Sequence, residues 1–347
     1  MIKFFRKIRH KLITENKVSK YLLYGIGEIV LVVIGILIAL NINNQNELKK
    51  NEQAVIASLK EIQNDLLIDI RSSQIFVDDY LKMDSIKVKI FDFESPWTYE
   101  DYKNGNFKIL GNLYYSFLAK KNGYESLTRQ IDYMPKKFDN TLNDIKILYV
   151  DMLDDIEIYN ERIQHTVYTN LDWNYDQNWT LHQLKYGETS KEEIDYYIYD
   201  DRYKKYILKY WNDIENIFKS SQKYRIKAIE TYIKIDSILI NKDKELPLYA
   251  LGKITSKNDI EKYLGIYTFS DEAIPFSAKL FIENNQLYSV NNSSLKRKHY
   301  KLNEELYMFM NSNPYYPVIW KFRKTKEGKI SMHFLNANVP DLFKKND

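Results

Sequence analysis

Residues 21–42 read YLLYGIGEIVLVVIGILIALNI, and this stretch decides how the whole chain is organised. At about 1.5 Å per residue a helix of this length is about 33 Å long, enough to cross a hydrocarbon core of about 30 Å. Fourteen of its residues are Leu, Ile or Val, and Glu28 carries its one charge. Each aliphatic residue favours insertion by roughly 0.3–0.6 kcal/mol and the carboxylate opposes it by about 3 kcal/mol. We therefore predict a transmembrane helix over residues 21–42.

The residues that precede this helix are strongly basic. Residues 1–20 contain seven Lys or Arg residues and one Glu, so their net charge is +6. Because basic flanks stay in the cytoplasm, we expect residues 1–20 to be a cytoplasmic segment at a bacterial inner membrane and the chain from residue 43 onward to be periplasmic. The alternatives are a cleaved signal peptide, for which Ile38–Ile42 offers no small-x-small cleavage site, and a buried core helix, which leaves the adjacent cations unexplained.

One face of the predicted transmembrane helix combines small residues with the carboxylate. Gly25, Glu28, Val32, Gly35 and Ala39 are spaced by three and four residues and so share a helix face. Small residues allow helices to approach closely, and a carboxylate inside a membrane usually faces a partner or a cavity. We expect this face to pack against a second copy of the chain or another membrane protein. The alternative is a protonated Glu28 that bonds within its own helix.

Helical spacing continues after the membrane segment. Apolar residues over 46–90 recur at intervals of three and four, without Pro or Gly, and predict an amphipathic helix that extends the transmembrane helix as a stalk. A shorter helix is expected over Phe107–Lys121, with Gly123 as its stop signal.

Two further helices complete the helical region. Apolar residues over 138–167 recur at strictly alternating intervals of four and three residues. Residues 207–239 carry another apolar face. Ser190–Glu193 reads SKEE, a capping box that marks a helix start. These patterns predict an elongated helical bundle, with coiled-coil-like packing, over residues 43–245.

The spacing of apolar residues changes after Leu246-Pro247, from helical intervals to short alternating or apolar runs. Residues 246–258 are expected to be a linker and residues 259–347 a small β domain, an antiparallel sheet or barrel. The expected strands are Gly265–Phe269, Ala278–Ile282, Gln286–Val290, Tyr307–Met310, Val318–Arg323 and Lys329–Phe334. The expected interior is Tyr263, Ile266, Leu280, Ile282, Leu287, Ile319, Phe322, Ile330 and Phe334.

Amino-acid composition and charge exclude several kinds of functional site. The chain has no Cys, which excludes disulfides, Cys–Zn sites and thiol nucleophiles. Net charge is −6 over residues 41–249 and +5 over residues 250–347. The densest basic patch lies beside the apolar run, where anionic lipid headgroups explain it. We therefore expect the lipid bilayer as a partner, no nucleic acid and no cofactor.

The N-terminal sequence resembles a bacterial family of single-pass membrane proteins known as domain of unknown function 6090. The resemblance rests on Phe4–Arg9, Lys20–Tyr24 and Gly27–Gly35, with an echo at Gly123–Leu127. It covers about 45 residues closely and about 200 loosely. It implies a membrane anchor followed by a helical exported region, and it implies no activity.

The C-terminal part is similar in pattern to the β domain that follows penicillin-recognising serine hydrolase domains. Tyr263–Tyr267, Asn285–Tyr288 and Glu327–Ile330 carry this similarity. In those enzymes the β domain is not the catalytic part, so the resemblance implies no active-site residue.

Candidate catalytic and metal-binding patterns are weak. None of the five His residues has zinc-site spacing, and Glu161 with His165 lacks a third ligand. Ser293–Lys296 matches S-x-x-K, but it lies in an expected turn without companion motifs. The acidic runs around Asp151–Glu157 and Glu192–Asp201 are typical of solvated helix faces. We predict no catalytic, cofactor-binding or metal-binding residues.

One segment has the composition of a surface binding site. Trp173, Tyr175, Trp179, His182 and Tyr186 alternate with amides and carboxylates, a mixture suited to a sugar or peptide. The alternative, which we favour, is that these rings belong to the core of the bundle. Our interpretation of the sequence is a non-catalytic membrane-anchored scaffold or interaction protein. The alternatives are a ligand sensor using the β domain and an enzyme acting on the cell wall.

Overall fold

The structure is a computed structural model. It describes residues 18–239, 260–270, 275–310, 317–335 and 340–345. These form two compact units, residues 1–58 with 126–139 and residues 59–125 with 140–347. The predicted linker 246–258 and most of the basic segment 1–20 lie outside the described residues.

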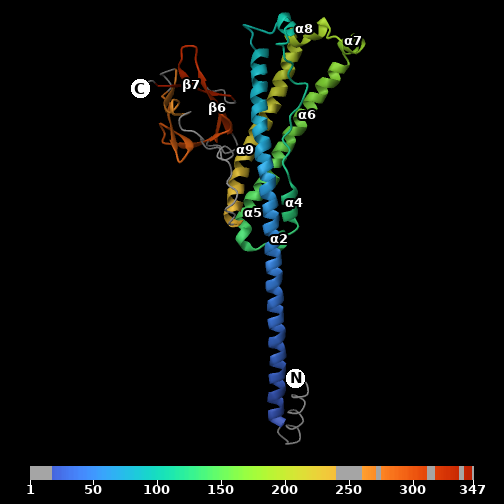
Figure 1. Cartoon of the computed structure of the whole chain (residues 1–347), viewed down its shortest axis with the longest axis vertical. Coiled ribbons are helices and arrows are strands. Elements are labelled where there is room, and N and C mark those ends of the chain that lie inside the picture. Colours follow the sequence, from blue (N-terminus) through green and yellow to red (C-terminus); the bar gives the residue numbers. More distant parts are fainter. Residues whose placement is uncertain (1–17, 240–259, 271–274, 311–316, 336–339, 346–347) are drawn as a thin grey trace. The chain divides into compact units, whose positions relative to one another are not determined.

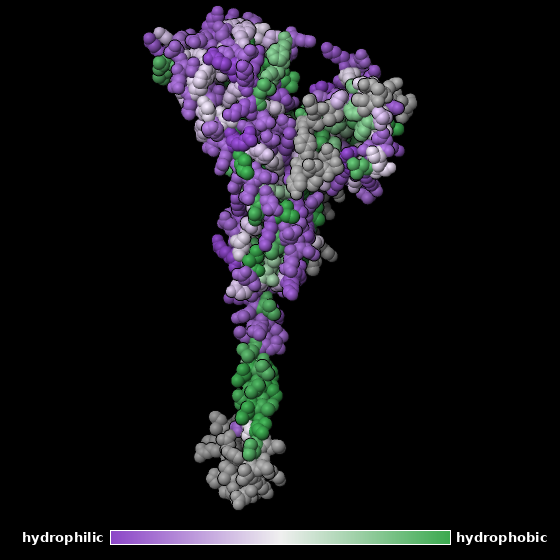
Figure 2. All heavy atoms as spheres, turned by 180° about the vertical axis from the view of Figure 1, so that it is seen from behind, coloured by the Kyte–Doolittle hydropathy of each residue, from purple (hydrophilic) through white to green (hydrophobic). Residues whose placement is uncertain are grey.

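A single helix, α2, spans Val18–Ile90 without interruption over 73 residues. The predicted transmembrane segment forms part of it, and its side chains are exposed from Ile29 to Ile42, with Leu31 68 % exposed. Figure 2 shows these side chains as a continuous apolar band. The helix is long and apolar enough to cross a membrane, properties that a signal sequence shares. No Gly or Pro follows Gly35 within α2, so the sequence offers no break before Ile90.

The later part of α2 belongs to a helical bundle, as its spacing predicts. The predicted face from Val55 to Val77 is buried. In the second unit, Tyr80 of α2 stacks on Phe218 of α9 (Asp201–Leu239) with 3.9 Å between ring centroids. Such pairs add to the stabilisation that burial alone provides.

Other helices complete the helical region. They are α3 (Tyr99–Lys103), α4 (Asn122–Thr128), α5 (Asp139–Lys146), the π-helical turn Ile147–Met152, α6 (Leu153–Tyr175), α7 (Asn178–Tyr186) and α8 (Lys191–Tyr199), with short 3-10 turns at Ile131–Tyr133 and Lys136–Phe138. The predicted helix start at Ser190 is confirmed, since its hydroxyl accepts a hydrogen bond from the backbone N–H of Glu193 at 3.2 Å. Of the predicted capping box, the structure shows this half.

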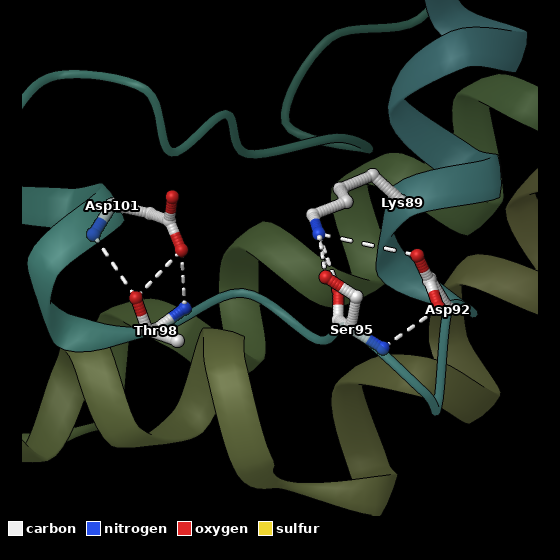
Figure 3. A network of polar contacts seen from close by, with 5 residues as sticks. All are labelled: Lys89, Asp92, Ser95, Thr98 and Asp101. Atoms are coloured by element: carbon white, nitrogen blue, oxygen red, sulfur yellow. Dashed lines mark hydrogen bonds and ion pairs between the residues drawn. The ribbon is translucent and has the colours of Figure 1, made fainter.

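A polar network shapes the turn at the end of α2 (Figure 3). Lys89 Nζ lies 3.2 Å from Ser95 Oγ, and the backbone N–H of Ser95 donates to Asp92 at 2.9 Å. Thr98 and Asp101 then form a complete capping box at the start of α3. These bonds satisfy backbone donors where the chain leaves the helix.

Residues 106–121, the extended segment, contain neither helix nor strand, so the helix predicted over Phe107–Lys121 is wrong. Side chains from the helices satisfy its backbone instead. The Tyr203 hydroxyl accepts from the N–H of Leu110 and donates to its carbonyl, both at 2.9 Å. The Asn160 amide bonds both the N–H and the carbonyl of Phe117. Because these side chains replace helical hydrogen bonds, apolar spacing alone misassigns the segment.

The C-terminal region is a closed antiparallel barrel in which each strand pairs with its neighbours in chain order. Its strands are β1 (Gly265–Phe269), β2 (Ser277–Glu283), β3 (Gln286–Asn291), β4 (Lys296–Lys301), β5 (Leu306–Met310), β6 (Pro317–Lys324), β7 (Ile330–Phe334) and β8 (Leu342–Lys344). The six predicted strands are confirmed. Two were missed: β4 reads KRKHYK and β8 is three residues long, so neither has an apolar pattern.

The barrel interior is filled by side chains. Its buried cluster is Ile260, Tyr267, Leu280, Leu287, Tyr307, Trp320, Met332 and Leu342. Seven of the nine residues expected there are buried in this cluster or packed against it. Ile266 is instead 45 % exposed, because Tyr267 takes the inward position on β1. Ile319 is buried, but it alternates with Trp320 and so faces outward from β6.

Candidate binding site at one end of the β-barrel

One end of the barrel gathers basic and aromatic side chains. Strand register places Lys301 of β4 opposite Tyr307 of β5, and Phe322 of β6 opposite Met332 of β7. Cross-strand partners share a face, so Lys301, Tyr307 and Phe322 all point to the barrel interior near this end. The fold thereby collects residues that are far apart in sequence.

These side chains border a cavity of about 370 Å³. It is lined by Ile260, Tyr263, Lys301, Glu304, Glu305, Tyr307, Lys321, Phe322, Arg323 and Lys324. We call it the rim cavity. Its size is within the range of about 300–1,000 Å³ that is typical of small-molecule sites.

Aromatic rings form one wall of the rim cavity. Tyr263 stacks on Phe322 with 4.2 Å between centroids and 10° between planes. Tyr307 meets Phe322 edge to face at 5.5 Å. The Tyr267 hydroxyl donates to the carbonyl of Tyr263 at 2.6 Å, which fixes the short segment before β1 against the barrel. The wall is therefore held in place from inside the barrel.

Four cations also line the rim cavity, Lys301, Lys321, Arg323 and Lys324. Lys301 pairs with Glu304 at 2.7 Å. For Lys321, Arg323 and Lys324 the described part of the chain provides no ion pair. The same hairpin continues to a second cavity, of about 530 Å³, lined in part by Lys326, Lys329 and Lys344. The β6–β7 hairpin is thus a concentrated source of positive potential.

The polar centre of the barrel is closed to ligands. His299 is 1 % exposed, its Nε2 lies 2.8 Å from Ser289 Oγ, and Trp320 Nε1 donates to its Nδ1 at 3.0 Å. The Trp320 bond requires Nδ1 to be the acceptor, so Nε2 carries the proton. Burial, assisted by Arg297, lowers the pKa of His299 to about 3. His299 is a neutral structural residue.

A Ser–Asp–His group, formed by two residues of β7 and Asp341 just before β8, does not form a catalytic triad. Asp341 accepts from Ser331 at 3.0 Å and lies 2.8 Å from His333 Nδ1. In a hydrolytic triad the His must contact the Ser and take its proton, whereas here Asp341 lies between them. Ser331 is also fully buried. Within the described residues, no group of three His, Asp or Glu could hold a metal ion.

A buried acid lies in the bundle. Asp69 of α2 accepts from the backbone N–H of Lys120 at 3.0 Å and from the Tyr224 hydroxyl at 2.8 Å. Burial raises the pKa of Asp69 to about 6 against these hydrogen bonds. Asp65 accepts from the N–H of Gly123 at 2.8 Å. Asp69 holds the end of the extended segment and Asp65 holds the first turn of α4. Neither lines the rim cavity or the second cavity.

The predicted aromatic segment divides into two sets. Trp173 and Trp179 lie 5.7 Å apart and pack with Tyr196 of α8, so they belong to the bundle core. Tyr175 and Tyr186 are 70 % and 58 % exposed. His182 packs beside Tyr186 and its Nδ1 lies 3.2 Å from the carbonyl of Glu188. None of these five residues lines the rim cavity or the second cavity.

The predicted helix-packing stripe lies on one side of α2. Gly25, Glu28 and Val32 line a shallow groove of about 440 Å³ together with Ile29 and Val33. Gly35 has no atom within 4 Å of an added Cβ, and Ala39 is exposed. Whether a partner helix covers this stripe stays a prediction.

The weaker candidates do not assemble into sites. Lys296 pairs with Glu283 and lies at the start of β4, while Ser294 adopts a left-handed turn conformation. Glu157 pairs with Lys121 at 2.6 Å, and Asp200 with Arg202 at 2.5 Å. His165 stands exposed on α6.

Fold and site together define a class of helical-bundle protein. Its described residues include one helix suited to a membrane span and a filled eight-stranded barrel with a basic rim. The model of a family of unknown function, DUF6090, matches residues 28–94, which is most of α2 and the turn after it. This match confirms the N-terminal resemblance. No curated protein and no solved structure matches the chain.

The rim cavity was not predicted from the sequence. Its signal is the run KFRKTKEGK at residues 321–329, which holds five cations and one Glu. The run shows where charge concentrates. The aromatic wall depends on strand register and on the segment before β1, which the sequence pattern does not give.

Proposed function

We propose that the chain is a non-catalytic, single-pass membrane protein of the bacterial envelope that acts as a scaffold or interaction module. Its N-terminus is cytoplasmic, and its bundle and barrel lie in the periplasm. The observation that carries the proposal is the continuity of α2. One unbroken helix of 73 residues contains both the apolar span and the buried face from Val55 onward. A helix that runs from an apolar span into a buried face suits a protein that presents a binding surface near the membrane.

The alternatives have less support. A sensor that holds its ligand inside the barrel needs a hollow interior, and Trp320 and Tyr267 fill it with no exposure. An enzyme acting on the cell wall needs accessible acid–base groups in a cleft. Asp69, the carboxyl group whose pKa is raised to about 6, is enclosed by its structural partners.

Topology is tested with protease on spheroplasts. The charge difference across the apolar segment predicts that proteinase K degrades the barrel while residues 1–20 stay protected. Detection uses one tag at each end of the chain. Protection of the C-terminal tag, while a known periplasmic protein is cut, would contradict the proposed orientation.

Association through the membrane helix is tested by crosslinking in bilayers. Gly35→Leu should reduce crosslinked oligomer because a large side chain separates packed helices. Gly27→Leu, on another face of the same helix, is the matched control and should leave the oligomer unchanged. Equal oligomer fractions in the wild type, Gly35→Leu and Glu28→Leu would remove this part of the proposal.

A further inference from the structure

We propose that the rim cavity binds an anionic saccharide, a sugar unit that carries a phosphate or a carboxylate. The inference rests on the proposed function, since it names the ligand class through which the periplasmic barrel would interact. It assigns the site to residues of the barrel and of the short segment before β1.

The first step is charge. Lys321, Arg323 and Lys324 line the cavity, and none of them forms an ion pair with another described residue. Arg323 and Lys324 are exposed at the end of β6. A guanidinium binds a carboxylate or a phosphate through two parallel hydrogen bonds, and a nearby ammonium adds a point charge. The cluster therefore suits one compact anionic group.

The second step is the aromatic wall. Tyr263 and Phe322 are both half-buried, so their stacked rings present a partly uncovered apolar surface at the cavity. Aromatic rings bind ligands that have an apolar face and polar edges. A pyranose ring has that character, because its C–H groups form a face and its hydroxyls project from the edge. A bare inorganic anion would leave this wall unused.

The third step separates a saccharide from a polyanion. Glu304 and Glu305 line the same cavity and are exposed. Two carboxylates at the rim repel a nucleic acid or any ligand with dense negative charge. They are strong acceptors for hydroxyl groups. A ligand with several hydroxyls and one anionic group satisfies all three kinds of lining residue.

The test is isothermal titration calorimetry on the full-length chain in phosphatidylcholine nanodiscs. The probes are glucose 6-phosphate, glucuronic acid, glucose and inorganic phosphate. We expect the two anionic sugars to bind at least about tenfold more tightly than glucose or phosphate, a difference of about 1.4 kcal/mol. Binding should weaken as salt rises from about 0.01 to about 0.1 M, because the screening length falls from about 30 to about 10 Å.

Paired variants locate the site. Arg323→Gln with Lys324→Gln should raise the Kd of glucose 6-phosphate at least about tenfold. Lys279→Gln with Lys298→Gln removes the same charge from exposed positions on β2 and β4 and should leave the Kd within about twofold. Tyr263→Ser should weaken binding of the sugar phosphate without weakening that of phosphate.

Three results would overturn the inference: equal affinity for phosphate and glucose 6-phosphate, no binding of either anionic sugar, or equal losses in the two double variants. None of them bears on the protease and crosslinking experiments. Failure of the ligand assignment is therefore distinguishable from failure of the proposed membrane topology.

Discussion

The bundle and the barrel bury ionisable groups of opposite kind. In the bundle, Asp69 is an acid whose pKa burial raises to about 6. In the barrel, His299 is a base whose pKa burial lowers to about 3. In each case the loss of water around the group shifts its pKa in the direction that favours the neutral form. Each also makes two side-chain or backbone hydrogen bonds that fix its neighbours.

The difference predicts opposite pH dependence in the two regions. A His with a lowered native pKa is stabilising above its unfolded pKa and loses that contribution as pH falls. An Asp with a raised native pKa binds protons more readily when folded, so its region loses stability as pH rises. Acid should therefore weaken the barrel under conditions where it spares the bundle.

The largest effect is expected for the barrel in acid. The pKa of His299 falls from about 6.5 in the unfolded chain to about 3 in the folded barrel. The free energy of unfolding should therefore fall by about 5 kcal/mol between pH 6.5 and pH 3. The measurement is urea unfolding followed by the NMR signal of the Trp320 indole N–H, which bonds His299. His299→Gln should flatten the dependence, since its amide can accept from Trp320 and donate to Ser289.

The matched control is His333→Gln. His333 is partly exposed and pairs with Asp341, so this substitution should keep the steep acid limb of the barrel. A barrel whose stability is level from pH 6.5 to pH 3 in the wild type would show that the polar centre opens to water.

The second effect tests the junction of the extended segment with α2. A Cβ at Gly123 would lie 2.4 Å from the backbone N of Ile62 and 2.8 Å from the carbonyl carbon of Glu61. Because backbone cannot move aside as a side chain can, Gly123→Ala should destabilise the bundle by about 3 kcal/mol. Far-UV circular dichroism during urea unfolding measures it. Gly187→Ala, with no atom within 4 Å but a positive φ, should cost about 1 kcal/mol.

Sequence patterns correctly predicted the helices and strands that bury one continuous apolar face. The heptad-like spacing of α2 and α9 gave their existence and their inward residues, because a helix stripe has one dominant solution. The strands with apolar alternation were found for the same reason. Gly123, expected to end a helix, instead permits backbone contact with α2.

The features that sequence patterns did not predict depend on residues that are distant in sequence. The extended segment has helix-like apolar spacing, but its hydrogen bonds come from Tyr203 and Asn160, which are 43 to 93 residues away. The rim cavity needs the register of β4, β5 and β6. Strand β4 carries His299 in a run of cations, and only closure of the barrel explains its burial.

The third effect measures how much one tyrosine holds the extended segment. Tyr203→Phe leaves the N–H and the carbonyl of Leu110 without their partner in a buried environment. Unpaired buried groups of this kind cost about 1–3 kcal/mol, so we expect a loss of about 2 kcal/mol in the bundle and none in the barrel. Tyr199→Phe, at an exposed position on α8, is the control and should change neither. An equal loss in both variants would mean that the hydroxyl of Tyr203 has no special role.

The smallest effect, and the one of opposite sign, is expected for Asp69→Asn. Between pH 4 and pH 6 the native wild type binds more protons at Asp69 than the unfolded chain does, so bundle stability should fall across this range and level off above it. Asn has no proton to lose, and its amide can accept from Lys120 and donate to the Tyr224 hydroxyl. The variant should therefore lack the slope and exceed the wild type by about 1 kcal/mol at pH 8. This gain is smaller than the roughly 3 kcal/mol set by a two-unit shift, because Asn gives up hydrogen bonds to a charged acceptor. Asp154→Asn, on the exposed face of α6, should keep the wild-type slope. A variant at position 69 that is less stable than the wild type at pH 8 would show that the ionised carboxylate stabilises the bundle, and the contrast between acid and base in the two regions would then be lost.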